Sequence, residues 1–419
     1  MKKNFKKAQN ELNIIFFKHN PKRTKIVCVL IFCFSILLLV INTLINNGVL
    51  YIPSPDGDLY LNIADNFLGS FHFIQNIRPH ETDMIVPFGL PVIFIMLKLI
   101  VNSVYFIVFV QYIIFGITCV LLYLISKKIF SGVGVLSPII FVFSIITFYP
   151  NSTPSYVTTE TYFLFILVLS IYIFFSKIHK TKKLLLLNVV LFIGYIVRPL
   201  LSVIFFPCLF YTVLQMLFKK VDYKSNLKYI VIFPVILLLN VCVNYRETRN
   251  FVLLENYSGI TIYLANNPNT KTTEYSSLKL SSFADERFYE IYNDSNITNN
   301  QKNKIFTEEG KNYMINNPAK TLENVFTKFY NLFLGSGIKW SVLLSIFTAL
   351  LLIFFEKKQK KMHLITLCSF VLLCFATSMG LYMKRYSMII LPFLVIYQAG
   401  FFEILLKKIF NSVNIEDVK

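Results

Sequence analysis

Apolar residues fill long runs along most of this chain, and short polar segments separate the runs. Several runs have about 18 residues or more without a charge, which is long enough for a helix to cross a bilayer. We count ten runs, so the pattern predicts an all-α integral membrane protein with about ten transmembrane helices. The runs cover residues 26–47, 103–126, 132–150, 161–176, 184–197, 200–218, 229–244, 340–355, 362–382 and 386–406.

Two longer and more polar segments interrupt the runs, and the alternation of spans places both on the outer face. Residues 48–101 form the first outer loop, which belongs to an amino-terminal membrane region of residues 1–244. Residues 245–339 form a large outer loop. Residues 340–419 carry the last membrane spans and a short cytoplasmic tail.

The second half of the large outer loop has the periodicity of helices. Pro318 follows Asn316 and Asn317, and a proline suits the first turn of a new helix. We therefore expect a largely helical loop that lies over the mouth of the membrane region.

Residues 84–101 are apolar enough to form a span of their own. Pro87, Gly89 and Pro91 disfavour a regular helix at the start of this stretch. Counting it as a span would also move the basic pair Lys127 and Lys128 to the outer face. We interpret the stretch as an interfacial or re-entrant helix, and an eleventh span is the alternative.

The positions of the basic residues explain the net charge of +19. Of the 41 Lys and Arg residues, 25 lie in short clusters beside apolar runs. This is the positive-inside pattern, so the charge indicates topology and not nucleic-acid binding. It predicts a multi-pass protein of a cell or inner membrane, in contact with membrane lipid, with both termini cytoplasmic.

The middles of the ten apolar runs contain no Asp, Glu, Lys or Arg. Transporters and proton pumps usually place ionisable groups at that depth, so the pattern disfavours them. The charged candidates lie at outer span ends and in outer loops instead. They are Asp56 and Asp58 after the first span, Glu81 and Asp83 later in the same loop, Glu160 at the start of the fourth span, Arg198 after the fifth, and Lys384 and Arg385 before the last.

Carboxylates and guanidinium groups on one membrane face suit one reaction in particular. A carboxylate can act as general base on an acceptor hydroxyl, and arginine can hold a departing phosphate with two hydrogen bonds. Because no nucleotide sugar is expected outside the cell, a sugar donor would have to arrive as a membrane-borne polyprenyl phosphate. The acceptor would be a glycan, a lipid or a protein.

Histidines in the first outer loop leave a metal ion open as a cofactor. His72 and His80 share this loop with Glu81 and Asp83, but their spacing matches no firm ligand pattern. No cofactor is certain, and a divalent ion stays an alternative. The seven cysteines all lie inside apolar runs without a CxxC pair, so they are interpreted as small apolar residues.

Short motifs at the outer span ends follow one another in a recognisable order. They are Asp56-Gly57-Asp58-Leu59-Tyr60-Leu61-Asn62-Ile63-Ala64, Pro87-Phe88-Gly89-Leu90-Pro91, Thr159-Glu160, Gly194 with Arg198-Pro199, Asn266-Asn267-Pro268, Asn316-Asn317-Pro318, and Arg385-Tyr386 followed by Leu391-Pro392. In this order they resemble the GT-C superfamily of membrane glycosyltransferases, in the branch of the protein O-mannosyltransferases and the lipid A aminoarabinose transferase. The resemblance extends from Asp56 to Pro392, about 330 residues.

The resemblance implies an inverting sugar transfer from a polyprenyl-phosphate donor, with Asp56 as the catalytic base. Arg198 and Arg385 would bind the donor phosphate, with Glu160, Tyr60 and Lys384 in support. Gly57 stands where the family has a second acid, so Asp58 either shares the role of the base or has none. Glu81 or Asp83 would be the second acid of the loop.

Two other functions remain open at this stage. A polysaccharide polymerase or O-antigen ligase type of enzyme would also use a lipid-linked sugar, but with Arg and His in a late outer loop. A lipid or glycan flippase is the alternative outside enzymes. Neither the sugar nor the acceptor follows from the residues.

Overall fold

A computed structural model describes residues 21–77, 81, 83–130, 134–218, 223–272, 279–332, 339–355, 360–380 and 384–416. Within these ranges the chain is helical, and its one isolated β-type pairing is a parallel bridge between Ile52 and Tyr156. A helix satisfies its backbone hydrogen bonds internally, which long apolar segments in a bilayer require. The predicted all-α fold is confirmed.

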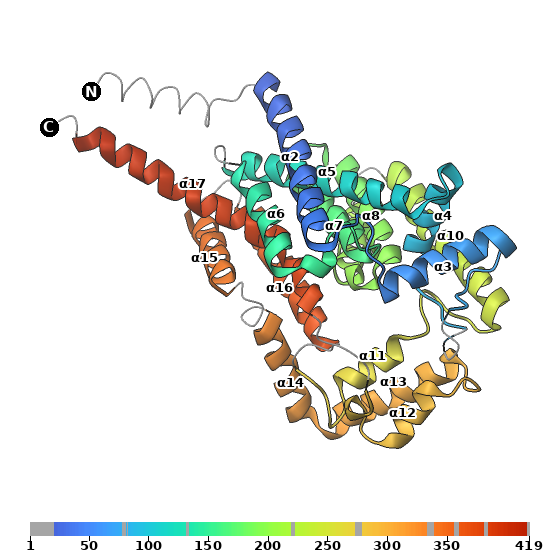
Figure 1. Ribbon diagram of the computed structural model, residues 1–419. Coiled ribbons are helices and arrows are strands. Elements are labelled where there is room, and N and C mark those ends of the chain that lie inside the picture. The colour runs from blue at the N-terminus through green and yellow to red at the C-terminus, as the bar shows by residue number, and fades with distance from the viewer. Residues whose placement is uncertain are drawn as a thin grey trace.

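The helices form a bundle with a smaller helical layer at one end (Figure 1). The bundle and its connections comprise α2 (Pro21–Asn47), α3 (Pro55–Ser70), α4 (Gly89–Ile100), α5 (Val104–Phe130), α6 (Leu136–Phe148), η2 (Pro150–Ser152), α7 (Thr159–Phe175), α8 (Lys180–Val197), η3 (Pro199–Leu201), α9 (Ser202–Leu217), α10 (Tyr223–Thr248), α15 (Lys339–Phe355), α16 (Lys360–Met379), η6 (Lys384–Ile390) and α17 (Leu391–Glu416). The layer comprises α11 (Ser258–Ala265), η4 (Leu280–Ser282), α12 (Glu286–Asn293), α13 (Asn299–Asn316) and α14 (Pro318–Tyr330).

Six helical stretches of the described chain are long and apolar enough to cross a membrane. They are Pro21–Asn47, Val104–Phe130, Pro199–Leu217, Ile230–Thr248, Lys360–Met379 and Arg385–Phe402. Four shorter apolar helices accompany them, at Gly89–Ile100, Leu136–Phe148, Thr159–Phe175 and Ser341–Phe354. These helices support a multi-pass membrane protein, and the full set of ten spans stays a prediction.

Helix α7 lies at the centre of the bundle, between α5 and α8. Its sequence is apolar on every side, as expected of a helix that is surrounded by others. Most of its residues are buried, including Phe163, Leu167 and Val168. The outer helices α2 and α10 instead expose many apolar side chains, which suits contact with lipid. The central helix therefore gives the candidate residue at its start, Glu160, a fixed position.

Helices α11 to α14 form the layer below the bundle in Figure 1 and have a small core of their own. Its centre is aromatic, with Tyr263, Phe283, Phe288 and Phe306 in mutual ring contact. Pro318 occupies the first turn of α14, as predicted. Residues 299–316 and 318–330 are thus helical, and their place in a loop on the outer membrane face stays a prediction.

The predicted helix within residues 84–101 is present as α4 (Gly89–Ile100). Its first residue, Gly89, lies so close to α8 that an added Cβ would come within 2.8 Å of the backbone of Ile196 and Val197. Only glycine fits this contact. Whether α4 lies along the membrane surface stays a prediction.

The two ends of the bundle carry different charges. We call the end that contains the start of α7 and the end of α8 the loop end, because α3 and the layer adjoin it. The opposite end is the lysine end. There Lys128 of α5 lies over the ring of Tyr172 and interacts electrostatically with Lys177 and Lys183. Basic residues from separate segments thus share one end of the bundle, and the side of the membrane on which this end lies stays a prediction.

Candidate functional site

Asp56 lies in the first turn of α3, directly after the chain leaves α2. Ser54 caps this helix, because its Oγ accepts a hydrogen bond of 3.1 Å from the amide of Gly57. Pro55 occupies the first turn, which suits its fixed backbone angle. Since Ser54 supplies the cap, the carboxylate of Asp56 is left for other partners.

Gly57 follows Asp56 at a position where the structure leaves no space for a side chain. An added Cβ would lie 2.7 Å from Ser54 Oγ and 2.8 Å from the carbonyl oxygen of Val157. The start of α3 therefore packs against the backbone that precedes α7, with no space for a side chain. This close approach sets Asp56 beside the first turn of α7.

The segment between α6 and α7 is fixed to its neighbours by hydrogen bonds. The amide of Ile52 donates to the carbonyl of Ser155 at 3.1 Å. Gln111 of α5 donates to the carbonyl of Pro154 at 2.7 Å and to that of Tyr156 at 3.1 Å. The start of α7 is therefore held on both sides.

Glu160 and Arg198 form a buried ion pair between α7 and α8. The distance from Arg198 Nη1 to Glu160 Oε1 is 3.3 Å, and the Glu160 side chain is only 4% exposed. Gly194 allows the two helices to meet, because a Cβ there would come within 2.8 Å of Ile166 and 2.3 Å of Leu201. Pro199 then ends α8, which leaves Arg198 directed at Glu160.

Arg385 connects this pair to Asp56. Its Nη1 lies 2.7 Å from Asp56 Oδ2, and its Nε lies 3.8 Å from Glu160 Oε1. The four predicted residues Asp56, Glu160, Arg198 and Arg385 thus form one cluster, from four separate segments. We call it the carboxylate–arginine cluster.

Aromatic rings hold the two guanidinium groups from the side. The Arg198 guanidinium lies 4.9 Å from the centre of the Tyr386 ring and 5.2 Å from that of Phe163. Arg385 lies 5.8 Å from the Tyr386 ring. Such stacking favours the planar guanidinium and leaves its edge available for hydrogen bonds.

Arg385 retains donor capacity inside the cluster. Its Nε is buried, and among the described residues it has no hydrogen-bond acceptor. At 3.8 Å, Glu160 attracts this group electrostatically but is too far to accept a hydrogen bond. In the described arrangement, Nε is therefore a buried donor without an acceptor.

Three further polar residues surround the cluster, and the sequence interpretation named only Tyr60. Tyr60 lies one turn after Asp56, and burial together with the charges of Asp56 and Glu160 raises the pKa of its hydroxyl. Burial likewise raises the pKa of Glu255, whose carboxylate pairs with the hydroxyl of Tyr257. Both tyrosines stay protonated at neutral pH and are hydrogen-bond donors. Nothing in the sequence around Glu255 distinguishes it from other acids of the large loop.

Asp58 is close in sequence but has a different partner. It accepts a hydrogen bond of 3.1 Å from the hydroxyl of Tyr51. The structure therefore separates the two acids of the motif, with Asp56 in the cluster and Asp58 against the segment after α2. Lys384 begins η6, and its side chain lies outside the described residues.

The described contacts of Glu81 and Asp83 link them to the helical layer. Glu81 accepts a hydrogen bond of 3.1 Å from the hydroxyl of Tyr292 in α12. Asp83 accepts two from Asn299 at the start of α13, each at 2.9 Å. Both acids thus serve as links between the first outer loop and the layer.

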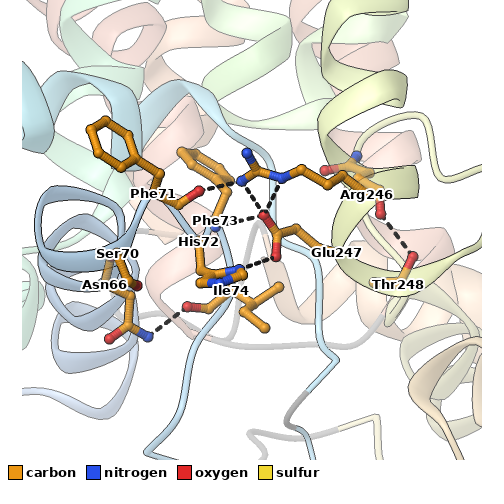
Figure 2. A network of polar contacts seen from close by, with 10 residues as sticks. Asn66, Ser70, Phe71, His72, Phe73, Ile74, Arg246, Glu247 and Thr248 are labelled. Atoms are coloured by element: carbon orange, nitrogen blue, oxygen red, sulfur yellow. Dashed lines mark hydrogen bonds and ion pairs between the residues drawn. The ribbon is translucent and has the colours of Figure 1, made fainter.

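A second polar network joins the end of α3 to the end of α10 (Figure 2). Glu247 is its centre, with His72 Nδ1 at 2.9 Å and Arg246 Nε at 3.0 Å. Arg246 also donates to the carbonyl of Phe71. His72 is therefore engaged with a carboxylate of another helix. Among the described residues no three His, Cys, Asp or Glu side chains gather as a metal-binding group, and His80 lies outside them.

No protein-family model matches the chain, and no curated protein matches it significantly.

Proposed function

We propose that this chain is a membrane glycosyltransferase that moves a sugar from a polyprenyl-phosphate carrier to a hydroxyl acceptor. One observation carries the proposal. Arg385 pairs with the carboxylate of Asp56 through Nη1 and still has a buried donor at Nε. A base and a phosphate-binding group are thus adjacent at the end of an apolar helical bundle, where a lipid-borne donor can reach them.

The donor phosphate would bind to the two guanidinium groups. Arg198 and Arg385 are stacked on Tyr386 and share Glu160, so their positions are set before the phosphate arrives. Preorganised donors of this kind stabilise negative charge that develops on a leaving group. The tail of the carrier would remain in the surrounding membrane.

The transfer would use Asp56 as general base. The acceptor oxygen forms a bond to the anomeric carbon, and its proton moves to a carboxylate oxygen of Asp56. The bond between the anomeric carbon and the phosphate oxygen breaks at the same time. Its electron pair leaves with the polyprenyl phosphate, and Arg198 and Arg385 hold the added charge. Attack from the face opposite the phosphate inverts the anomeric centre.

Glu160 would act as a positioning residue in this scheme. Its carboxylate lies between the two arginines, and it neutralises part of their mutual repulsion. The protonated hydroxyls of Tyr60 and Tyr257, with Glu255, would offer hydrogen bonds to the sugar or to the acceptor. This arrangement agrees with the GT-C resemblance of the motifs, and it suits an enzyme whose loop end faces the outside of a cell membrane.

The experiment that tests the class of function uses the purified chain in sealed vesicles. Polyprenyl phosphates with radiolabelled hexoses or pentoses serve as donors, and an extract of the source cell's membranes supplies acceptors. We expect label in a lipid-free or new lipid product, together with free polyprenyl phosphate. Label that crosses the vesicle membrane on an intact carrier would instead identify a flippase.

A further inference from the structure

A large apolar cavity lies inside the bundle, apart from the carboxylate–arginine cluster. Its volume is about 470 Å³, within the range of roughly 300–1,000 Å³ that is usual for ligand sites. Four helices contribute most of its walls, with Leu167 of α7, Leu187 of α8, Pro207 of α9 and Phe370 of α16 among the lining residues. Such walls suit a hydrocarbon chain.

The charged groups of the cavity are both lysines. Lys180 and Lys183 of α8 line it at the lysine end of the bundle. Lys183 Nζ donates to the carbonyl of Phe174 at 3.2 Å, and Lys180 Nζ donates to Gln215 at 2.5 Å. Neither lysine pairs with a described carboxylate, so both positive charges remain available to a ligand.

Two more lysines add to the positive charge at this end of the cavity. Lys128 interacts electrostatically with Lys183 and with Lys177. A cluster of four like charges is unfavourable without anions. The cavity thus joins a strongly positive mouth to an apolar interior.

The cavity is also open to the surroundings of the bundle between α9 and α16. Tyr211, Ile365 and Leu372 line it and are at the same time exposed, each by 45% or more. In a membrane these positions face lipid. An acyl chain can therefore enter sideways from the bilayer while its headgroup stays at the lysines.

We infer that this cavity binds an anionic phospholipid of the leaflet at the lysine end. The phosphodiester would bind to Lys180 and Lys183, and an acyl chain would fill the space between α7, α8, α9 and α16. Charge complementarity carries the assignment, since the anion meets lysines without a described carboxylate partner. The inference is independent of the proposed enzymatic reaction.

The lining of the cavity favours this occupant over the tail of a polyprenyl carrier. A carrier held by Arg198 and Arg385 would have to enter from the loop end. Neither arginine lines the cavity, and on that side it ends at apolar residues such as Val203 and Ile389. The anionic group of an occupant would therefore be at the lysine end.

The test counts lipids that stay bound to the whole chain. The protein is placed in nanodiscs of phosphatidylcholine with a small fraction of phosphatidylglycerol, and retained lipids are counted by native mass spectrometry. We expect a retained phosphatidylglycerol on the unchanged chain. The double variant Lys180→Gln/Lys183→Gln should bind it roughly thirtyfold more weakly, since each lysine near an anionic lipid contributes about 1 kcal/mol.

Two further variants make the test specific. Lys360→Gln/Lys361→Gln removes a basic pair at the start of α16 that does not line the cavity, and it should retain the lipid. Ser369→Phe fills the cavity and leaves the lysines unchanged, and it should lose the lipid. Equal retention in the Lys180/Lys183 variant, or in Ser369→Phe, would overturn the assignment. Displacement of phosphatidylglycerol by added polyprenyl phosphate would also overturn it, in favour of the carrier tail.

Discussion

The two ends of the helical bundle differ in whether their cationic side chains pair with carboxylates. At the loop end, Arg198 and Arg385 lie against carboxylates, with distances of 2.7–3.8 Å to Asp56 and Glu160. At the lysine end, Lys180 has an amide neighbour, Lys183 a carbonyl and Lys128 an aromatic ring, and no described carboxylate pairs with them.

The difference follows from how deeply each end buries its charged groups. A buried charge is stable only with a partner, because removal from water costs several kcal/mol. The loop end buries Glu160 and therefore needs its arginines. Lysines at the other end extend their charged tips toward water or lipid headgroups and need no acid. Under the proposed function, the paired and buried charge belongs to the catalytic site, and the lysines are the groups that would contact lipid headgroups.

Glu160→Gln should have the largest effect on stability. It removes the carboxylate beside Arg198 and Arg385, so that the loop end, like the lysine end, would have cations without this partner. Arg198 would lose its buried partner, and two guanidinium groups would face each other. Loss of one partner of a buried pair costs about 3–5 kcal/mol of unfolding free energy. Denaturation of the purified protein in detergent measures this loss.

The matched control for Glu160 is an exposed ion pair. Glu323 pairs with Lys320 on α14 at 2.8 Å, and its side chain is 62% exposed. Glu323→Gln should change the unfolding free energy by no more than about 1 kcal/mol. Equal effects of the two substitutions would mean that the Glu160 pair is no more than a surface contact.

Arg385→Ala should reduce sugar transfer by about 10²–10³-fold, the usual cost of one donor to a developing oxyanion. Arg385→Lys should restore only part of the rate, because an ammonium cannot replace Nη1 and Nε together. Arg287→Ala on α12 is the control, since this exposed arginine lies over Phe288 and away from the cluster. Normal donor turnover in Arg385→Ala would reduce Arg385 to a structural residue.

Lys328 is a cation that departs from the pattern of the loop end. It is buried, and its Nζ donates to the carbonyls of Ala265 and Gly380 at 3.1 and 3.0 Å. Burial lowers the pKa of its ammonium group to about 8. Between pH 8 and 10, Lys328 is more often protonated in the unfolded chain than in the folded chain. Its contribution to the free energy of unfolding therefore increases with pH, by about 2 kcal/mol over that range.

The variant Lys328→Met isolates this contribution. Its unfolding free energy should lack the rise that the unchanged chain shows between pH 8 and 10, because the titrating group is gone. Lys320→Met removes an exposed lysine of the same helix and should keep the rise. Identical pH profiles for the unchanged chain and Lys328→Met would show that Lys328 titrates normally.

Asp58→Asn should have the smallest effect on transfer, within about tenfold of the unchanged rate. Asparagine can still accept the hydrogen bond from Tyr51, which is the described contact of Asp58. The transfer assay measures this directly. A rate as low as that expected of a missing general base would move the base from Asp56 to Asp58.

The sequence predicted much of the site because its residues lie at span ends. The predicted spans put Asp56, Glu160, Arg198 and Arg385 near one membrane face, and the structure brings these four residues into contact. Helices need no long-range pairing to be recognised, so the all-α fold and the helix after Pro318 were also predictable. The GT-C resemblance and the ten spans stay predictions.

Other features depended on packing that no local pattern reports. Glu81 and Asp83 resembled site acids by position, yet they bind Tyr292 and Asn299, which are more than 200 residues away in sequence. Glu255 was missed because only the path of the large loop in the folded structure brings it near Tyr60, and no local sequence pattern indicates that path. From the sequence, Gly57 was only the residue that replaces a second acid, whereas in the structure it allows the start of α3 to pack against the backbone of Val157.

The most direct test of the account is the transfer rate of Asp56→Asn beside that of Asp65→Asn. Both substitutions remove one carboxylate from α3, but Asp65 pairs with Lys98 outside the cluster. With the donor that the unchanged chain uses, Asp56→Asn should be slower by about 10²–10⁴-fold, the range of general base catalysis. Asp65→Asn should transfer at nearly the unchanged rate. An active Asp56→Asn protein would contradict the assignment of the carboxylate–arginine cluster as the catalytic site.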